Sequence, residues 1–352
     1  WSVTGVQTCA LPISGVLDHS IHAGLEETGI AAELAIANEL REDLAEHAAQ
    51  VNPFVTDRTV VLEAPMQEVA FDHTALESLA EVDVLVAGLP CSGASLAGRA
   101  KRSLAHPEEH PMVGHLVVAA LAFIGRLNPS VVVLENVPTY ARSASASILR
   151  SQLRDFGYQV HERELLGTDF GDLERRKRWC LVAVSQGIEF SLDSLTAGPF
   201  PVRRLADVLE PPEAVADRWS EMRGLKAKQE RDAAAGKGFR MQVYDGSESS
   251  INTLTKGMQR NRSTDPKIAH PTNPQLLRIP TAREHARIKG VPETLIEGLS
   301  QTTAHEMLGQ GICYSPFRAL GRHIGQALHA FAEGVRSQAA GTSPAALLLD
   351  AA

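Results

Sequence analysis

The chain has 352 residues, of which 44% are hydrophobic, and a formal net charge of −8. This length allows one large domain with a smaller one, and no apolar run reaches the roughly 18 residues of a membrane span. No charged-then-apolar leader resembles a signal peptide. The four cysteines form no CxxC pair, which argues against a disulfide framework and a zinc site and favours a reduced, cytoplasmic compartment.

The first thirteen residues, WSVTGVQTCALPI, differ from the rest of the chain. They lack charge, strand alternation and a helical period, and they resemble translated sequencing-adapter sequence. We therefore expect residues 1–13 to be non-native and the native sequence to begin near Ser14. The first strand of the fold is then either absent or replaced by an unrelated segment.

Residues 14–187 alternate between helical and β-rich segments. Apolar periodicity predicts helices over residues 18–28, 41–50, 74–80, 111–127 and 144–156. Strands are predicted over residues 33–37, 59–62, 82–89, 130–135, 158–165 and 179–184. Because these strands lack clean in/out alternation and are separated by helices, they indicate a mostly parallel sheet covered on both faces. The prediction is a doubly wound α/β domain.

Residues 188–277 break this pattern with several prolines and a polar, glycine-containing stretch at 221–250, which predicts a small, loop-rich insert. Residues 1–87 contain two basic and fifteen acidic residues, whereas residues 218–267 contain eleven basic and six acidic ones. This asymmetry suggests different partners for the two parts, although chance variation would also produce it. Residues 278–335 carry helical patterns at 281–289 and 317–335 and are expected to rejoin the α/β domain, and residues 336–352 to form a disordered tail.

Cys91 lies in the segment GLPCSGAS, residues 88–95, directly after a predicted buried strand. Active-site groups in open α/β sheets lie just beyond the carboxyl ends of strands. Pro90 before the cysteine and small residues after it predict a loop that a ligand can approach closely. The alternative interpretation is a buried, inert structural cysteine.

Glu135 ends the apolar segment 130–135 and is followed by Asn-Val-Pro. Burying a carboxylate is costly unless it is paired or protonated, so this residue is expected to have a function, with capping of the next segment as the alternative. Neighbouring strands would bring Glu135 within reach of Cys91. A thiol beside a carboxyl group fits covalent addition with proton transfer.

The segment ERRKRW, residues 174–179, immediately precedes another predicted strand. Such a basic run is usually a solvated face. On a strand, however, Arg176 and Arg178 would point the same way and could bind a phosphate or a base.

In this order, these segments resemble the motifs of the DNA cytosine-5 methyltransferase family. GLPCSGAS is similar to its nucleophile motif, ENV at 135–137 to its ENV motif, and ERRKR at 174–178 to its Gln-x-Arg-x-Arg motif. RIPTAREHARIKGVP at 278–292 and LGQGICYSPFRALGRHIG at 308–325 resemble its last two motifs, and the region from residue 14 to ANE at 37–39 resembles its cofactor-binding start. The resemblance covers residues 14–330 and depends on the correct order of the motifs.

The resemblance implies a Rossmann-like methyltransferase core with a small target-recognition domain. Cys91 would attack C6 of a cytosine flipped out of double-stranded DNA, and Glu135 would engage N3 and the exocyclic amine. Arg176 would help to fix the base, and Arg178 would support the site or the DNA backbone. The expected partners are double-stranded DNA and a cognate restriction endonuclease, with no membrane and with the chain as a monomer.

The resemblance also implies S-adenosylmethionine as the cofactor. Gly15 and Leu17 would remain from the glycine-rich turn, Pro90 would contact the cofactor, and Glu39 would bind its ribose hydroxyls. For Glu39 the alternative is an ordinary surface acid. Where the family pattern has Gln, Gln and Asn, this chain has Ser92, Glu174 and Gln310, and residues 63–66 lack the expected Gly-Asp-Ile-like motif.

Other functions remain possible at this point. A tRNA-directed relative would carry a Cys-Phe-Thr signature, which the sequence lacks. An inactive homologue that only binds DNA or cofactor would not need Cys91 and Glu135. A nicotinamide-dependent dehydrogenase would show GxGxxG after a strand. Within the DNA interpretation, residues 236–262 are the expected contact surface, with Arg240, Arg260 and Arg262 binding phosphates.

Overall fold

The computed structural model describes residues 5–11, 15–72, 82–89, 108 and 116–341. Cys91, Pro90 and Ser92 lie outside the described residues, as does the helix expected over 74–80.

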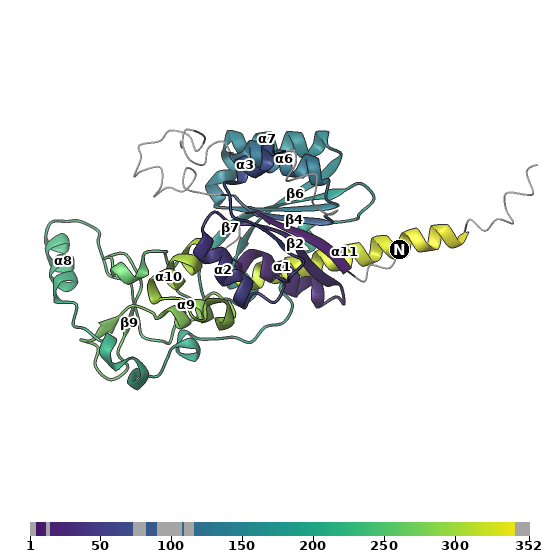
Figure 1. Cartoon of the computed structure of the whole chain (residues 1–352). Helices are drawn as coiled ribbons and strands as arrows, with labels where there is room; N and C mark the ends of the chain where they lie inside the picture. Colours follow the sequence, from purple (N-terminus) through teal and green to yellow (C-terminus); the bar gives the residue numbers. More distant parts are fainter. Residues whose placement is uncertain (1–4, 12–14, 73–81, 90–107, 109–115, 342–352) are drawn as a thin grey trace, which may run out of the picture.

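The described strands form a central sheet of seven strands in the order β3-β2-β1-β4-β5-β7-β6 (Figure 1). They are β1 (Gly5–Leu11), β2 (Ala31–Asn38), β3 (Val60–Leu62), β4 (Val84–Gly88), β5 (Val131–Asn136), β6 (Tyr158–Leu166) and β7 (Lys177–Ser185). All pairs from β3 to β5 are parallel, and β7 runs antiparallel to both β5 and β6. The predicted mostly parallel, doubly wound sheet is confirmed, with an antiparallel strand between β5 and β6.

Strand β1 occupies the middle of the sheet, although its residues show no polar/apolar alternation. It pairs in parallel with β2 on one side and β4 on the other, and Cys9 and Leu11 are fully buried. Of the two expected alternatives, an absent first strand or one supplied by this segment, the structure has the second, and the non-native origin of residues 1–13 stays a prediction. A strand covered on both faces needs no polar/apolar alternation, so the missing alternation was no evidence against a strand.

Helices cover both faces of the sheet (Figure 1). One face carries α1 (Val16–Glu26), α2 (Glu42–Val51) and α11 (Tyr314–Gly341). The other face carries α3 (Met66–Phe71), α6 (Leu116–Leu127) and α7 (Ala144–Asp155). Successive strand residues point to opposite layers: Val84 and Val86 join the core with α1 and α11, whereas Leu85 and Ala87 join the core with α6.

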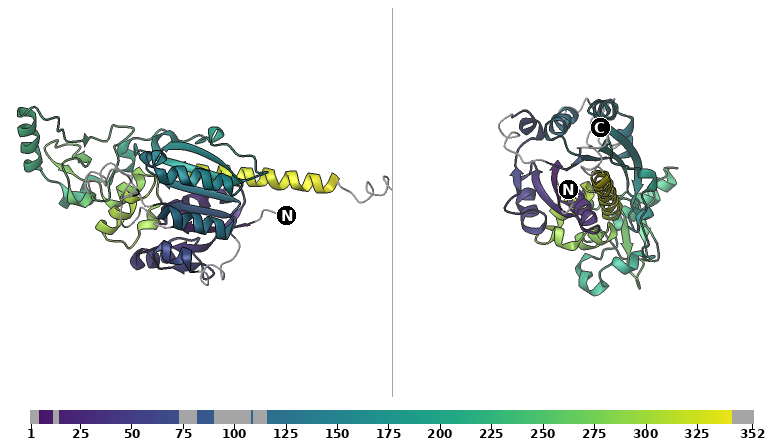
Figure 2. Two further views of the ribbon diagram at one scale, coloured as in Figure 1. Left: turned by 90° about the horizontal axis from the view of Figure 1, so that it is seen from above. Right: turned by 90° about the vertical axis from the view of Figure 1, so that its right-hand side faces the viewer.

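A second lobe lies beyond the carboxyl ends of the parallel strands, and α11 extends past the opposite end of the sheet (Figure 2). The lobe contains a small sheet, β10-β9-β8, made of β8 (Val243–Tyr244), β9 (Lys267–Ala269) and β10 (Leu277–Arg278). Most of its other elements are short 3₁₀ turns, including η5 (Leu205–Val208), η6 (Pro212–Arg218) and η7 (Met258–Arg260). Its small core combines Ile251, Leu254 and Met258 with Leu173 and Ile288, so the lobe packs directly on the sheet domain.

One helix of this lobe, α8 (Arg223–Ala234), was not expected from its polar sequence. It has no buried residue, which explains why no apolar periodicity marks it.

The chain returns to the sheet through α9 (Ala282–Ile288), the turn η8 (Glu293–Ile296), α10 (Gln301–Gln310) and α11. Helix α9 begins with a capping box between Thr281 and Glu284. Helix α11 continues to Gly341, past the predicted helix end at Val335, and residues 342–352 lie outside the described part. None of the helices in the described ranges combines the length and the hydropathy of a membrane span.

Candidate active site

Strand β4, which leads toward Cys91, ends next to Glu135. Strands β4 and β5 are adjacent and parallel, and Gly88 is the register partner of Glu135. The Asn136 side chain is buried, and its Nδ2 donates a hydrogen bond of 3.1 Å to the carbonyl oxygen of Leu89. Asn136 therefore fixes the point at which the segment leading to Cys91 leaves β4.

Glu135 forms an ion pair with Arg178 across β5 and β7. The distance between Arg178 Nε and Glu135 Oε1 is 2.6 Å, and both side chains are nearly buried. Burial raises the pKa of the Glu135 carboxyl above its ordinary value, and the positive charges of Arg178, Arg176 and Lys289 oppose this rise. The carboxyl group is thus held in one orientation in an environment that favours retention of a proton.

The basic run before β7 has two different faces. Arg175 and Lys177 are exposed, whereas Arg176 is buried and Arg178 is partly buried. The prediction that Arg176 and Arg178 share one side fits this alternation, and the solvated-face interpretation holds only for Arg175 and Lys177.

Hydrogen bonds to the carboxyl end of α10 hold the Arg176 side chain. Its Nη2 donates hydrogen bonds of 2.9 Å to the carbonyl oxygen of Gly309 and 3.3 Å to that of Gln310. Its Nε has no hydrogen-bond partner among the described residues. This group is therefore a buried donor available to a ligand.

Glu174 and Lys289 form a fully buried ion pair next to Arg176. Lys289 Nζ lies 2.8 Å from Glu174 Oε2, and Arg176 Nη1 lies 3.7 Å from Glu174 Oε1. Although burial opposes ionisation, Lys289 and Arg176 hold the pKa of the Glu174 carboxyl below its ordinary value. The sequence singled out Glu174 only as a departure from Gln and did not point to Lys289. The sequence did carry one signal for a buried Lys289, namely its position between the apolar residues Ile288 and Val291.

Three of the four predicted cofactor residues, Gly15, Leu17 and Glu39, lie at this edge of the sheet, and the fourth, Pro90, lies outside the described residues. Gly15 caps α1, no side chain of the described residues caps this helix start, and Leu17 lies in its first turn. A Cβ atom on Gly88 would lie 3.6 Å from Leu17 Cδ2, which places Leu17 beside the start of the Cys91 segment. Glu39 follows β2 and is partly buried, and burial raises the pKa of its carboxyl group.

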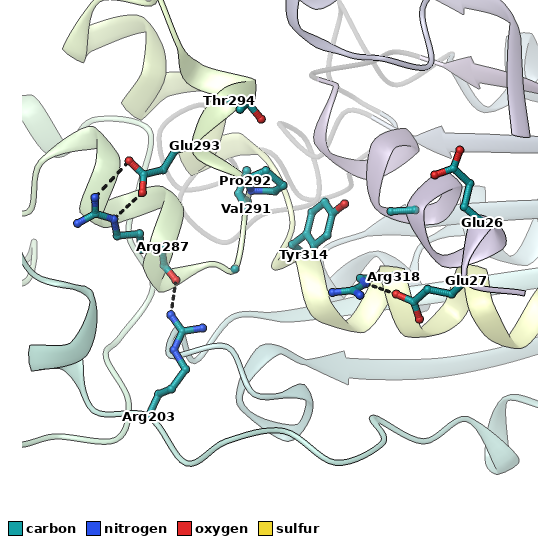
Figure 3. Close-up of a pocket in the computed structure, with 12 residues that line it drawn as sticks. Glu26, Glu27, Arg203, Arg287, Val291, Pro292, Glu293, Thr294, Tyr314 and Arg318 are labelled. Atoms are coloured by element: carbon teal, nitrogen blue, oxygen red, sulfur yellow. Dashed lines mark hydrogen bonds and ion pairs between the residues drawn. The ribbon is translucent and has the colours of Figure 1, made fainter.

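An open hollow of about 740 Å³ lies elsewhere, where the carboxyl end of α1 faces α11 and the segment before η8 (Figure 3). Two ion pairs, between Arg287 and Glu293 at 2.6 Å and between Arg318 and Glu27, join four of the charged side chains around it. Neither Glu135 nor the Gly15 end of α1 lines this hollow, so we do not assign the candidate chemistry to it.

Comparison with known proteins gives concordant results. The model of the C-5 cytosine-specific DNA methylase family matches residues 19–326. The chain is 25% identical over 271 residues to the Type II methyltransferase M.NlaX of Neisseria lactamica, which covers 74% of this chain and 82% of that protein. It is 26% identical over 270 residues to the Type II methyltransferase M.MspI of Moraxella sp, which covers 73% of this chain and 60% of that protein.

Solved structures share the fold. The S. pombe Dnmt2 methyltransferase superposes with a TM-score of 0.69 at 18% identity, over 93% of this chain and 99% of that chain. The Entamoeba histolytica methyltransferase EhMeth superposes with a TM-score of 0.70 at 15% identity, over 92% of this chain and 99% of that chain. At such identities the likeness concerns the fold alone.

Proposed function

The chain belongs to the C-5 cytosine-specific DNA methylase family, a family of DNA methyltransferases, and we propose that it methylates C5 of cytosine in double-stranded DNA. The observation that carries this proposal is the ion-paired Glu135 at the end of β5, next to the strand that leads into the Cys91 segment. A buried carboxyl group next to the strand that precedes a candidate nucleophile suits covalent addition to a base.

In the proposed mechanism, the Cys91 thiolate forms a bond to C6 of a cytosine flipped out of the duplex. The electron pair displaced from the C5–C6 bond moves into the ring, where the Glu135 carboxyl group stabilises it by donating its proton or a hydrogen bond to N3. The raised pKa of Glu135 keeps that proton available. Once C5 has taken the methyl group that the cofactor would supply, loss of the C5 proton to solvent, expulsion of the Cys91 thiolate and return of the N3 proton to Glu135 restore the aromatic ring.

S-adenosylmethionine, when bound, would supply the methyl group. The residues at the edge of the sheet fit such a ligand. The start of α1 lacks a side-chain cap among the described residues, so its N–H groups suit a carboxylate. Glu39 presents a carboxyl group at the end of β2, as recognition of ribose hydroxyls requires. We propose Gly15, Leu17, Glu39 and Pro90 as the cofactor contacts.

The arginines have separate roles in this proposal. Arg178 orients the Glu135 carboxyl group through their ion pair. Arg176, with its unpartnered Nε, binds the flipped base.

We propose residues 188–277 as the target-recognition region, between a catalytic part at 14–187 and its completion at 278–335. Arg240, Arg260 and Arg262 are exposed in this region and suit phosphate contacts. The names of the relatives support a role in a restriction–modification system, with a cognate endonuclease that cuts the unmodified site. We place the activity in the cytoplasm, with the chain acting as a monomer.

The test of this function uses a DNA duplex that contains 5-fluorocytosine, together with S-adenosylmethionine. Because fluorine at C5 cannot leave as a proton does, the enzyme stays attached to the base. We expect a denaturation-resistant protein–DNA adduct for the full chain and none for Cys91→Ser. Methyl transfer that persists in Cys91→Ser would refute the mechanism, and methylation of tRNA but not DNA would refute the substrate class.

A further inference from the structure

A cluster of charged side chains lies buried where the recognition lobe meets the sheet. Glu174 and Lys289 are completely buried and Arg176 is 5% exposed. The Glu174 carboxylate uses one oxygen for Lys289, at 2.8 Å, and the other for the backbone N–H of Leu254, at 2.7 Å. A neutral side chain would accept these contacts less strongly, since hydrogen bonds to charged groups are the stronger ones.

The recognition segment 251–256 docks on the sheet domain at this cluster. Its backbone pairs with residues 173–175: the N–H of Ile251 donates to the carbonyl oxygen of Leu173 at 2.8 Å, and the N–H of Arg175 donates to that of Ile251 at 2.8 Å. The bond from Leu254 to Glu174 adds a side-chain contact to this ladder.

A second docking point involves α10. A Cβ atom on Gly309 would lie 2.1 Å from the backbone nitrogen of Lys256, so only glycine permits this approach. The carbonyl oxygen of the same Gly309 accepts the hydrogen bond from Arg176. The two groups that hold the segment, Glu174 and Gly309, are therefore also direct partners of Arg176.

We propose that Glu174 and Lys289 are a positioning pair that couples the seating of segment 251–256 to the placement of Arg176 beside Glu135. Lys289 pairs with Oε2 of Glu174 and keeps the carboxyl group ionised, and the other oxygen, Oε1, accepts the hydrogen bond from Leu254 and faces Arg176. A DNA target that fixes the position of segment 251–256 then also fixes the position of Arg176, which faces the reacting base. This inference rests on the proposed function, because it takes Arg176 and Glu135 as the site of reaction.

Several other groups that ionise surround the pair and belong in any account of its pH dependence. Arg176, Cys313 and Asp172 interact electrostatically with Glu174, and all three also do so with Lys289. Glu135 interacts with Arg178, Arg176 and Lys289, and His285 with Lys289 and Arg176.

The experiment compares Lys289→Gln, Glu174→Gln and the double variant in the full chain. Each single change leaves one buried charge without its closest partner, whereas the double variant removes both charges and keeps a neutral hydrogen-bonding pair. We expect each single variant to lose stability and about tenfold in kcat, and the double variant to regain stability but not kcat, because it lacks the ionised carboxylate. Recovery of wild-type kcat in the double variant would overturn the proposal.

Removal of Lys289 raises the pKa of Glu135 through charge alone, because Lys289 lowers that pKa directly. The variant that separates positioning from this charge effect is Glu174→Gln. Loss of a nearby negative charge alone would lower the pKa of Glu135, whereas displacement of Arg176, whose charge lowers that pKa, would raise it. We expect the rise, measured without turnover from the infrared carboxyl band of Glu135 as the difference from Glu135→Gln. A fall or an unmoved band in Glu174→Gln would contradict the inference.

Hydrogen exchange at the Leu254 amide reports docking independently of activity. We expect about tenfold faster exchange in Lys289→Gln, because Glu174 no longer holds this N–H as firmly. The matched control is Glu284→Gln, which breaks the equally buried ion pair with Arg278 at 2.6 Å. It is expected to lower stability without moving the Glu135 band. If the wild-type chain transfers no methyl group, the proposed function fails, while the infrared and exchange measurements still decide the coupling.

Discussion

Glu135 is a buried carboxyl group whose chemistry depends on the guanidinium beside it. Burial alone would keep this group protonated, and a fully ionised carboxylate could not donate to N3 of a base. The ion pair with Arg178 opposes the rise in the Glu135 pKa that burial causes. It also fixes the direction of the carboxyl group. The residue can therefore hold or release a proton without changing its position.

Removal of Arg178 is expected to lower stability in a pH-dependent way. In Arg178→Met the pKa of Glu135 rises further, because the positive charge of Arg178 no longer counteracts the effect of burial on that pKa. A raised folded-state pKa gives stability that is present at low pH and lost as pH rises through that pKa. The loss relative to wild type is therefore smallest at about pH 5 and reaches about 3 kcal/mol at about pH 8, measured by urea unfolding.

The neighbouring Lys177→Met is the control for Arg178→Met. Lys177 is 50% exposed and its pair with Glu164, at 3.1 Å, lies in solvent, so we expect a change below about 0.5 kcal/mol. An equal loss for Arg178→Met at both pH values would show that the pKa of Glu135 does not depend on this pair.

At the scale of elements, the crossing of α1 and α11 depends on small residues. A Cβ atom on Gly24 would lie 2.1 Å from the carbonyl oxygen of Arg318, and one on Gly321 would lie 2.2 Å from that of Ile21. The two helices thus touch through their backbones. This crossing places the start of α1, with Gly15 and Leu17, against the edge of the sheet.

We expect Gly321→Ala and Gly334→Ala to have opposite effects, although both lie in α11. The first forces the helix backbones apart and should cost about 3 kcal/mol. The second adds a methyl group that meets nothing within 4 Å and should stabilise the helix by about 0.5–1 kcal/mol. Thermal or urea unfolding measures both, and a loss in Gly334→Ala equal to that in Gly321→Ala would contradict this account.

The helices and strands that the sequence predicts are those whose own residues carry an apolar pattern. Helices α1 and α7 and strands β2, β5 and β7 appear within a few residues of their expected bounds. Helix α10 was missed because its QTTAHEMLGQ sequence is largely polar, and its buried face, with Ala304 and Leu308, is defined by contacts with α9 and η7. Strand β1 was missed because alternation is the wrong test for a central strand.

The candidate site was predictable in part for a related reason. Glu135, Arg176 and Arg178 each stand at the end or start of a predicted strand, so topology alone places them together. Lys289 joins them through a partner 115 residues away, Glu174, and such a pairing leaves no local pattern in the sequence.

At the scale of the whole molecule, acidic and basic residues are concentrated in different segments of the chain. The described part of the acidic segment 1–87 contributes strands β1 to β3 and the sheet edge at which we place the cofactor, and the basic segment 218–267 lies in the lobe beyond the strands. Lys267 is an exception within the basic part. It is buried and donates to the carbonyl oxygens of Arg262 and Asp265, so it supports the lobe from inside.

Neutralisation of the exposed arginines Arg240, Arg260 and Arg262 tests the DNA-binding lobe. Replacing all three by Ala is expected to weaken DNA binding and to reduce the slope of log affinity against log salt by about 3. Replacing Arg126 and Arg154, which lie at the far ends of α6 and α7, should leave both quantities unchanged. An unchanged slope in the triple variant would show that phosphates are bound elsewhere.

The packing of α11 on α1 also determines the order in which the protein can fold during synthesis. Ile21 and Leu25 of α1 share their core with Phe317, Leu320 and Ile324, which the ribosome adds only after the entire second lobe. Until then the growing chain carries an uncovered apolar stripe, a state that favours aggregation. Translation that stalls within the second lobe therefore leaves a sheet domain without its covering helix, which makes this family member dependent on uninterrupted synthesis or on chaperone protection.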